Sequence, residues 1–443
     1  MTNGMRTVLA TTVVLSAATL FAGWEDEAWR FARTTVYCPK TKLVYDYRVG
    51  TGENALVGCL PTPKEIRANF PVVTGWSTGM EDSVLSGTTL LLAAMARYDR
   101  LGEPETLDFL HDLFDGLCHC CEYAKVPGFL ARSICPADGR SHYINSSRDQ
   151  YTLYVYAFWQ YYRWPKATEA ERARIRKILV DIARYAEKCV TPENNYSLLR
   201  EDGGNAFVCK MWTATPCVDC NPKGTLADYG EIHPHETLRL PEIYAAAHAV
   251  SGDRHWREME LKYADPGIEM SNGPIRQRML GYALYQMQIS VNLLYTCETD
   301  AARKARYLGL LKRCVSLTDD CFDYIRKKNA ELKGDYYATI PNWRTLKFSY
   351  LHWKGFHVDD VWSMHADWPK QFEDTSFVTR EVAEFVLIAS LCPGAEIPQS
   401  RIDILESVFA KLDFSRFNLS SGPVHALLAK ERLLATAIEL TDD

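Results

Sequence analysis

The stretch from Ser147 to Cys189 reads "SRDQYTLYVYAFWQYYRWPKATEAERARIRKILVDIARYAEKC" and contains two helical segments of opposite character. Residues 148–164 carry only three charged side chains, whereas residues 168–190 carry ten. A helix that is apolar on nearly all sides is buried, and a helix with a charged stripe faces water. The stretch therefore predicts an inner helix followed by an outer one, joined at a Trp-Pro break.

The same alternation recurs along the chain, since residues 277–297 carry one charge and residues 301–331 carry twelve. Strand signals are sparse, and helices are expected at 24–37, 82–100, 104–123, 148–164, 168–190, 236–251, 253–264, 277–297, 300–330, 378–392, 400–412 and 423–440. Alternating buried and exposed helices predict an all-α fold, an (α/α)6 toroid of about twelve helices. A superhelical solenoid is the main alternative, but no fixed repeat period is visible.

The longer connections should gather on one face of this ring. They lie at 61–81, 126–147, 191–235, 265–276 and 332–377, and all but one precede a low-charge segment. Loops carried on a rigid scaffold commonly build the rim of a pocket. The functional site is therefore expected where the inner helices begin.

Composition and the N-terminus bound the class of protein. The 443 residues are 47% hydrophobic and 24% charged, and the formal charge of −6 gives no reason to expect nucleic-acid binding. The opening "MTNGMRTVLATTVVLSAATLFAG" has one basic residue before an apolar run, which is typical of a secretory signal peptide and too short for a comfortable membrane span. We expect residues 1–22 to be that peptide and residues 23–443 to form a single domain, exported to the periplasm or beyond.

Fourteen cysteines are scattered along the chain. Several fall within expected helices, which favours buried free thiols: Cys118, Cys120, Cys121, Cys314 and Cys321. The tightest group, Cys209, Cys217 and Cys220, lacks the second Cys-x-x-Cys pair of a zinc site. A loop thiol cluster or a disulfide is the favoured interpretation, and no metal is expected.

Polar residues are dense just before the inner helix at 148–164. A capping box of Ser147 and Gln150 is one explanation, with Asp149 favoured in the first turn by the helix dipole. Capping leaves His142 and Arg148 unexplained. We expect Asp149 to enter the pocket beside both of them.

Asp82 heads the first inner helix, one helical hairpin earlier, although Asp82 or Ser83 could simply cap that helix. Carboxylates that head neighbouring inner helices would face each other across one pocket. Glycoside hydrolysis requires such a pair, one to protonate the leaving oxygen and one to activate water or attack the sugar. Asp149 and Asp82 are the candidate catalytic pair.

The third inner helix opens with "GEIHPHET", residues 230–237. Two histidines there lack a third metal ligand. We expect His235 to hydrogen-bond a sugar and Glu231 or Glu236 to be a further catalytic acid, with ordinary capping as the alternative.

Arginine and aromatic side chains should complete the pocket. Arginine suits a planar carboxylate, and flat aromatic rings suit sugar faces, so their combination favours a uronic acid. The residues expected to bind substrate are Arg148, His142, His235, Trp76, Arg276, Tyr336, Trp343 and Arg344. Each of them also has a structural interpretation.

The segment "GWSTG", residues 75–79, matches the G-x-S-x-G elbow of serine esterases. That elbow needs a preceding buried strand and a parallel sheet. The sequence offers neither, so this class is disfavoured.

The motifs "GMEDS" (79–83), "SSRDQYT" (146–152) and "HPHET" (233–237) resemble those of the uronic-acid-releasing (α/α)6 glycoside hydrolases of polysaccharide-degrading bacteria. The stretch "PGFLARSICPADGRSHYINSSRDQYT" (127–152) is similar to the β-glucuronidases of glycoside hydrolase family 154, and more distantly the chain resembles the unsaturated glucuronyl hydrolases. The resemblance implies cleavage of a terminal glucuronic acid from an oligosaccharide or glucuronide, without a cofactor.

In the unsaturated hydrolases an aspartate protonates the double bond of the sugar, a role that the resemblance would give to Asp149 or Asp82. Here "SSRDQ" replaces the tryptophan-rich surroundings of that aspartate. The departure favours ordinary β-glucuronide hydrolysis, which needs both carboxylates. An unsaturated glucuronyl hydrolase, a polysaccharide lyase on the same fold and a non-catalytic sugar-binding protein remain as alternatives. The aglycone, the linkage and the oligomeric state, a homo-oligomer included, stay open.

Overall fold

The computed structural model describes residues 23–46, 59–76, 78–216, 232–274, 281–331, 342–345, 349–351, 361–363, 370–414, 418–419 and 422–442. Helices dominate these residues, and the strands form three separate antiparallel pairs. The all-α prediction is confirmed. The expected signal peptide lies outside the described residues.

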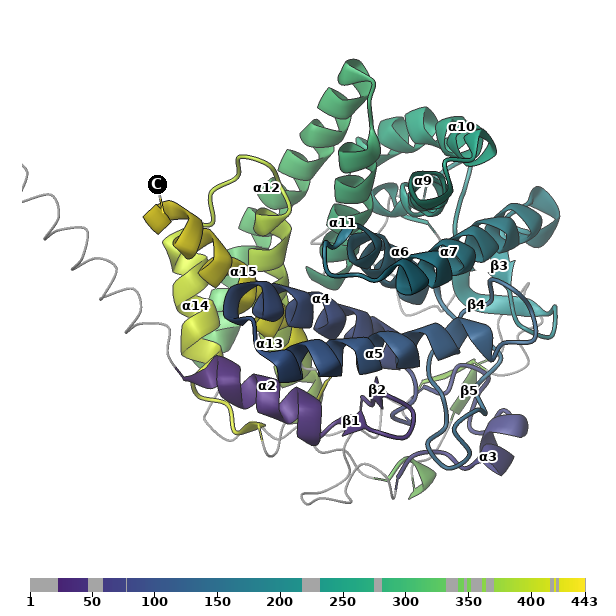
Figure 1. The fold of residues 1–443 in the computed structure, drawn as a ribbon, viewed down its shortest axis with the longest axis horizontal. Helices are drawn as coiled ribbons and strands as arrows, with labels where there is room; N and C mark the ends of the chain where they lie inside the picture. The colour runs from purple at the N-terminus through teal and green to yellow at the C-terminus, as the bar shows by residue number, and fades with distance from the viewer. Residues whose placement is uncertain are drawn as a thin grey trace, which may run out of the picture.

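Six helices form the inner layer: α4 (Ser83–Leu101), α6 (Arg148–Arg163), α9 (Arg239–Ser251), α11 (Gly281–Cys297), α13 (Lys370–Ser390) and α15 (Pro423–Asp442). Each packs on the next in this order, and α15 packs back on α4, so that the contacts close into a ring. Most of them lie toward the middle of the molecule in Figure 1. The closing contact distinguishes this arrangement from an open solenoid.

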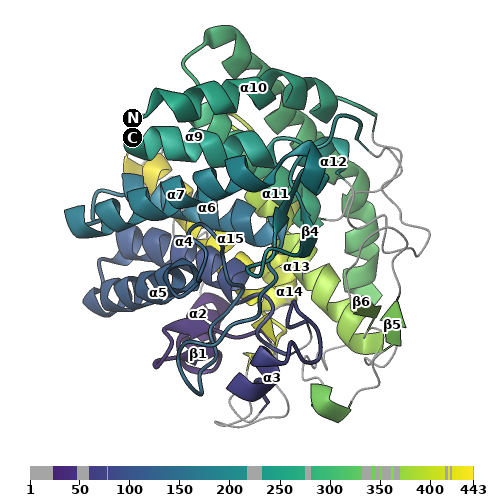
Figure 2. The ribbon, with the colours of Figure 1, turned by 90° about the vertical axis from the view of Figure 1, so that its right-hand side faces the viewer.

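Six further helices cover this layer: α2 (Trp24–Thr34), α5 (Pro104–Glu122), α7 (Glu169–Cys189), α10 (Arg254–Ser271), α12 (Ala301–Glu331) and α14 (Gln399–Phe409). Each packs on at least one inner helix, and α10 lies near the top of the helical body in Figure 2. On α7 the buried residues recur at helical spacing, as in Ile175, Ile178 and Ile182. The charge alternation in the sequence therefore predicts the layer for α6, α7, α11 and α12, whereas α13 lies in the inner layer although six of its 21 residues are charged.

Several helix ends differ from the prediction; for example, α13 begins at Lys370, eight residues before the expected start at 378. Helix α10 continues to Ser271 through Pro266, although the sequence indicates an end at residue 264. The Thr237 hydroxyl donates to the carbonyl of Gly267 at 3.0 Å, and a Cβ at Gly267 would lie 2.7 Å from the Leu238 side chain. Tertiary contacts of this kind outweigh the local cost of proline. Residues 265–271 are thus helical rather than part of the rim.

The β-pairs collect with the short helix α3 (Pro63–Arg67) on one side of the helical body, at the lower right of Figure 1. They are β1 (Tyr37–Cys38) with β2 (Leu43–Val44), β3 (Ser197–Leu199) with β4 (Asn205–Lys210), and β5 (Ser349–Leu351) with β6 (Val361–Ser363). Each pair lies in the chain between an outer helix and the following inner helix. This is the face at which the inner helices begin.

Two further expectations concern the described residues. Their twelve cysteines are all free and mostly buried, as predicted, whereas Cys217 and Cys220 lie outside them. No helix within them is long and apolar enough to cross a membrane.

Candidate functional site

Side chains from the starts of successive inner helices converge on this face. Asp82 precedes α4, Asp149 lies in the first turn of α6, and Arg239 begins α9. Tyr282 follows in the first turn of α11, and Arg380 is supplied by α13. The ring arrangement of the helices thus brings these residues to one face of the molecule.

Asp82 is the N-cap residue of α4, yet its side chain makes no capping hydrogen bond. Its Oδ1 instead accepts from a terminal nitrogen of Arg132 at 2.9 Å and from Gln150 Nε2 at 2.6 Å. Arg132 is itself anchored, because its Nε donates to the Glu81 carbonyl at 2.6 Å. With a side chain that is 25% exposed, Asp82 is both oriented and open to solvent.

Asp149 has the same character on the neighbouring helix. Its Oδ1 accepts from a terminal nitrogen of Arg239 at 2.5 Å, and its side chain is also 25% exposed. The predicted capping box is wrong, because the Ser147 side chain makes no capping bond. Gln150 is used differently: its Oε1 accepts from the backbone N–H of Leu85 at 3.1 Å, which ties the start of α6 to the start of α4.

Glu236, at the end of the 3-10 helix η2 (Pro234–Glu236), is almost completely buried. Its Oε1 accepts from Arg148 Nε at 3.0 Å and lies 3.1 Å from a terminal nitrogen of Arg239, an ion pair without hydrogen-bond geometry. Its Oε2 accepts from the backbone of His233 at 3.1 Å, which is the capping interpretation of this motif. A carboxylate engaged in this way positions two arginines and is poorly placed to transfer a proton.

The charges of these ion pairs also act on the pKa values of two neighbouring side chains, Tyr282 and Cys209. Burial, followed by the charges of Asp149 and Glu236, raises the pKa of Tyr282 well above its usual value, so that its phenol remains a donor. Burial raises the pKa of Cys209 to about 12, and the opposing charges come from Arg132 and Arg148. Cys209 therefore stays a neutral thiol, unsuited to nucleophilic attack.

Three carboxylates, those of Asp46, Glu81 and Asp82, lie within 4.8 Å of one another. Arg132 is bonded to Asp82, and the charge of Arg380 acts on both Asp82 and Asp46. Acidic groups that are compensated by guanidinium groups need no cation, so we assign no metal to them.

Three of the predicted binding residues hold the loops together instead. His142 Nε2 pairs with Glu201 Oε1 at 3.2 Å. Trp343 Nε1 donates to the Cys59 carbonyl at 2.6 Å, and Arg344 forms a two-pronged ion pair with Glu65 on α3, with both distances at 2.7 Å. These donors are engaged by the protein and are not brought to the site.

Of the remaining predicted residues, Trp76 alone has a described side chain. Trp76 is partly buried against the core. The side chain of His235 and all of Glu231, Arg276 and Tyr336 lie outside the described residues, as does Ser77 of the "GWSTG" segment. Residues 70–76 form no strand, so the esterase elbow lacks its preceding strand in the described part of the chain.

Residue type and spacing did not reveal several members of the site: Arg132, Gln150, Arg239, Tyr282 and Arg380. A signal did exist for two of them. Arg132 stands in "GFLARSIC" as the single charge of an apolar run, and Arg239 stands in "TLRLPEIY", where Glu242 is the one other charge. A charged side chain in such a setting must be paired when it is buried.

Beneath the site, Glu384 is fully buried on α13, and its Oε1 accepts from Arg380 Nε at 2.7 Å. Burial raises the pKa of Glu384 from 4.5 to about 7, against the opposing effect of Arg380. The native state thus binds this proton more tightly than the unfolded state does. The free energy of unfolding should therefore fall as the pH rises from 4.5 through 7.

The replacement Glu384→Gln removes this titration. Between about pH 4.5 and pH 8, the wild type should lose roughly 3 kcal/mol of stability relative to the variant. Urea unfolding of both proteins at the two pH values measures the difference. Parallel pH dependences would show that Glu384 ionises in the native state as it does in the unfolded chain.

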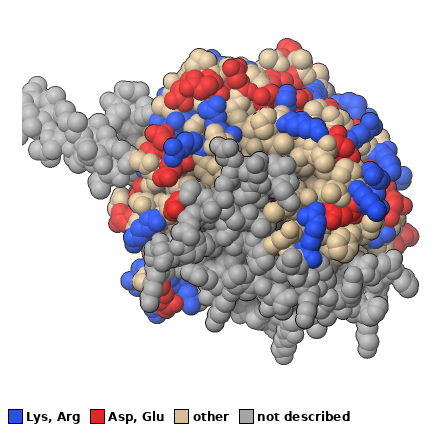
Figure 3. Space-filling view, turned by 90° about the horizontal axis from the view of Figure 1, so that it is seen from below, with Lys and Arg blue, Asp and Glu red and all other residues tan. Residues whose placement is uncertain are grey.

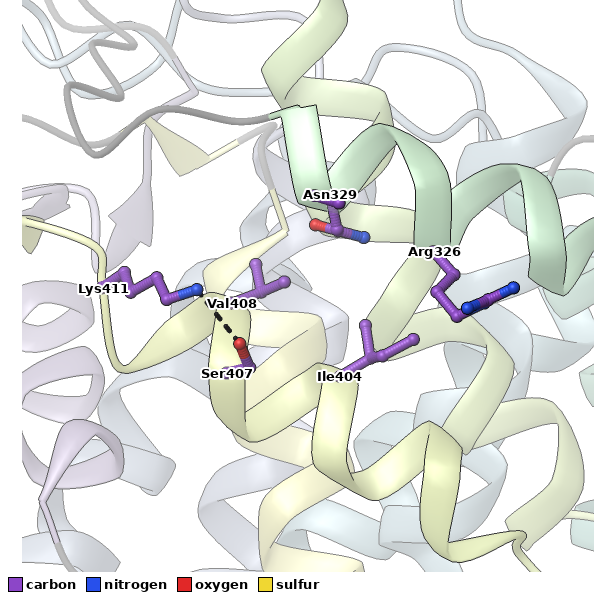
Figure 4. A pocket seen from close by; sticks show the side chains of 7 residues that line it. Arg326, Asn329, Ile404, Ser407, Val408 and Lys411 are labelled. Carbon is purple, nitrogen blue, oxygen red and sulfur yellow. Dashed lines mark hydrogen bonds between the residues drawn. The ribbon is translucent and has the colours of Figure 1, made fainter.

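Elsewhere, a hollow of about 190 Å³ lies between α12 and α14 on the outer layer (Figure 4). Arg326, Ser407 and Lys411 are among its lining residues, and Lys411 Nζ donates to Ser407 Oγ at 3.2 Å. It contains none of the paired acids described above. On the described surface seen in Figure 3, basic and acidic side chains are interspersed without a patch of one sign.

Comparison of the chain with models of protein families gives no match, and comparison with curated proteins gives no match either. The fold and the site together define an all-α protein with paired aspartates and arginines at one face of a helical ring.

Proposed function

We propose that this protein is an exported glycoside hydrolase that releases a terminal glucuronic acid from a β-glucuronide or oligosaccharide. The observation that carries the proposal is the pair Asp82 and Asp149. Both are partly exposed at the starts of neighbouring inner helices, and each is held through Oδ1 by an arginine. Within the described residues no hydrogen bond to either group uses Oδ2, which leaves one oxygen of each carboxylate for the substrate.

In this mechanism one aspartate protonates the glycosidic oxygen while the other activates water or attacks the anomeric carbon. Arg132 and Arg239 fix the two carboxylates before substrate arrives, so that little reorganisation is needed during the reaction. Arginine is the side chain best suited to bind the planar carboxylate of a uronic acid, and four arginines lie at this face: Arg132, Arg148, Arg239 and Arg380.

A polysaccharide lyase would need a tyrosine that can act as a base. Tyr282 is a tyrosine on which the charges of Asp149 and Glu236 act, and its pKa is raised well above the ordinary value, first by burial. A phenol of that kind donates hydrogen bonds and does not abstract protons near neutral pH. This observation favours hydrolysis over elimination.

The test is to incubate the protein with p-nitrophenyl β-D-glucuronide and, in parallel, with an unsaturated uronyl disaccharide. Saturated glucuronic acid as the product supports the proposal. Cleavage of the second substrate alone would assign the unsaturated hydrolase activity instead. A new double bond absorbing in the near ultraviolet would indicate a lyase, and binding without any product would indicate a sugar-binding protein.

The replacement Glu236→Gln separates positioning from proton transfer. Because Glu236 holds Arg148 and Arg239, its loss should misplace both and lower kcat/KM by about 10–100-fold. The shape of the pH–rate profile should stay unchanged. The loss of one limb of that profile in the variant would instead assign proton transfer to Glu236.

A further inference from the structure

Arg380 differs from the other described arginines at the site in exposure, because its side chain is 15% exposed whereas those of Arg132, Arg148 and Arg239 are 5%, 6% and 1% exposed. Its Nε donates to Glu384 Oε1 at 2.7 Å, one helical turn along α13. Its two terminal nitrogens have no acceptor in the described part of the chain, and the side chain is 15% exposed. One edge of the guanidinium is thus fixed by a buried carboxylate, and the outer nitrogens are available.

The other three arginines are already engaged with carboxylates. Arg132 binds Asp82, Arg239 binds Asp149, and Arg148 binds Glu236. Their hydrogen bonds orient the catalytic and positioning acids. Arg380 is the most exposed of these four described arginines, and no described residue accepts a hydrogen bond from its terminal nitrogens.

The position of Arg380 is well determined by the fold. A Cβ at Gly422 would lie 2.7 Å from the Arg380 Cα, and Gly422 has a positive φ of 87° that suits glycine. This close fit joins α13 to the start of α15. The charge of Arg380 also acts on Asp82, which places its guanidinium near one of the two candidate catalytic groups.

We propose that the terminal nitrogens of Arg380 bind the carboxylate of the substrate's uronic acid and so set the preference for glucuronic acid over glucose. The inference rests on the proposed function. In it, Arg380 determines the preference for the uronic acid, and Glu384 positions the Arg380 guanidinium. A guanidinium fork matches a carboxylate with two parallel hydrogen bonds. Because Asp46 and Asp82 are also near, recognition comes from these direct bonds and not from a broad positive field.

The test compares kcat/KM for p-nitrophenyl β-D-glucuronide and p-nitrophenyl β-D-glucoside. The replacement Arg380→Met should lower the value for the glucuronide about 100-fold or more, because the carboxylate loses the two hydrogen bonds of the guanidinium fork, and change the value for the glucoside little. Arg380→Lys keeps the positive charge but not the forked donor geometry, so its kcat/KM for the glucuronide should lie between those of the wild type and Arg380→Met. Arg326→Met, beside the hollow on α12, removes an arginine that is 59% exposed and serves as the control.

Binding of D-glucuronate and D-glucose, measured by calorimetry, makes the outcome independent of turnover. If the wild type binds glucuronate without cleaving any glucuronide, and Arg380→Met removes that binding, the inference stands and the hydrolase proposal fails. If glucuronides are cleaved and Arg380→Met leaves the preference unchanged, the inference is overturned and the hydrolase stands. A wild type that neither binds nor cleaves glucuronate overturns both. Should Arg380→Met fail to fold, Arg380→Lys gives the same comparison.

Discussion

Replacing Asp149 or Asp82 by asparagine should lower kcat for p-nitrophenyl β-D-glucuronide by about 10³–10⁴-fold. Asparagine keeps the size of the side chain and an oxygen that can accept from Arg239 or Arg132. It cannot transfer a proton or attack the sugar as a carboxylate does. Both side chains are partly exposed, so the variants should fold as the wild type does.

The two variants should also differ from each other in an informative way. A dinitrophenyl glucuronide has a leaving group that needs little protonation. The variant that lacks the general acid should therefore recover much of its rate on this substrate, whereas the variant that lacks the base or nucleophile should not. Comparing kcat on the two aryl glucuronides assigns the roles of Asp82 and Asp149.

Asp108→Asn is the matched control, because Asp108 is exposed on the outer helix α5. It removes one carboxylate from the same ring without touching the site, and its kcat should equal that of the wild type. If Asp149→Asn and Asp82→Asn also keep full activity on whichever substrate is cleaved, the site assignment is wrong even though the enzyme class survives.

Much of the fold is predictable from local patterns. The expected helix at 104–123 is found at Pro104–Glu122, and the expected helix at 423–440 is found at Pro423–Asp442. Hydrophobic periodicity, helix caps and charge stripes depend only on residues that are close together in the sequence, so they can be recognised without the structure. The end of α10 required knowledge of the contact of Gly267 with Thr237, which no window contains.

Some residues of the candidate site are likewise predictable from the sequence, and others are not. Asp82 and Asp149 are predictable because both head low-charge helices, and the ring brings such helix starts to one face. Their partners Arg132 and Arg239 come from distant segments, and pairing in space leaves no local pattern. Arg344 shows the converse, since its residue type suits a uronic acid but its donors are already bound to Glu65.

A buried charge cluster lies where α15 packs on α4 and closes the ring. Glu431 is fully buried, and Arg100 donates two hydrogen bonds to its carboxylate, from Nε at 2.7 Å and from a terminal nitrogen at 2.9 Å. Arg97 approaches the same carboxylate at 3.4 Å and continues to Asp26 on α2 at 2.9 Å. The cluster therefore connects the last inner helix, the first inner helix and the N-terminal outer helix.

Glu431→Ala should lower the free energy of unfolding by about 3–5 kcal/mol, because it leaves two largely buried guanidinium groups without their shared counter-ion. Denaturant unfolding at pH 7 measures the change. Asp323→Ala is the control: Asp323 is 76% exposed in its pair with Arg326, and the loss of such a surface pair should cost at most about 1 kcal/mol. Equal effects of the two replacements would mean that water reaches Arg97 and Arg100 freely, and that the junction of α15 with α4 is held by its apolar contacts instead.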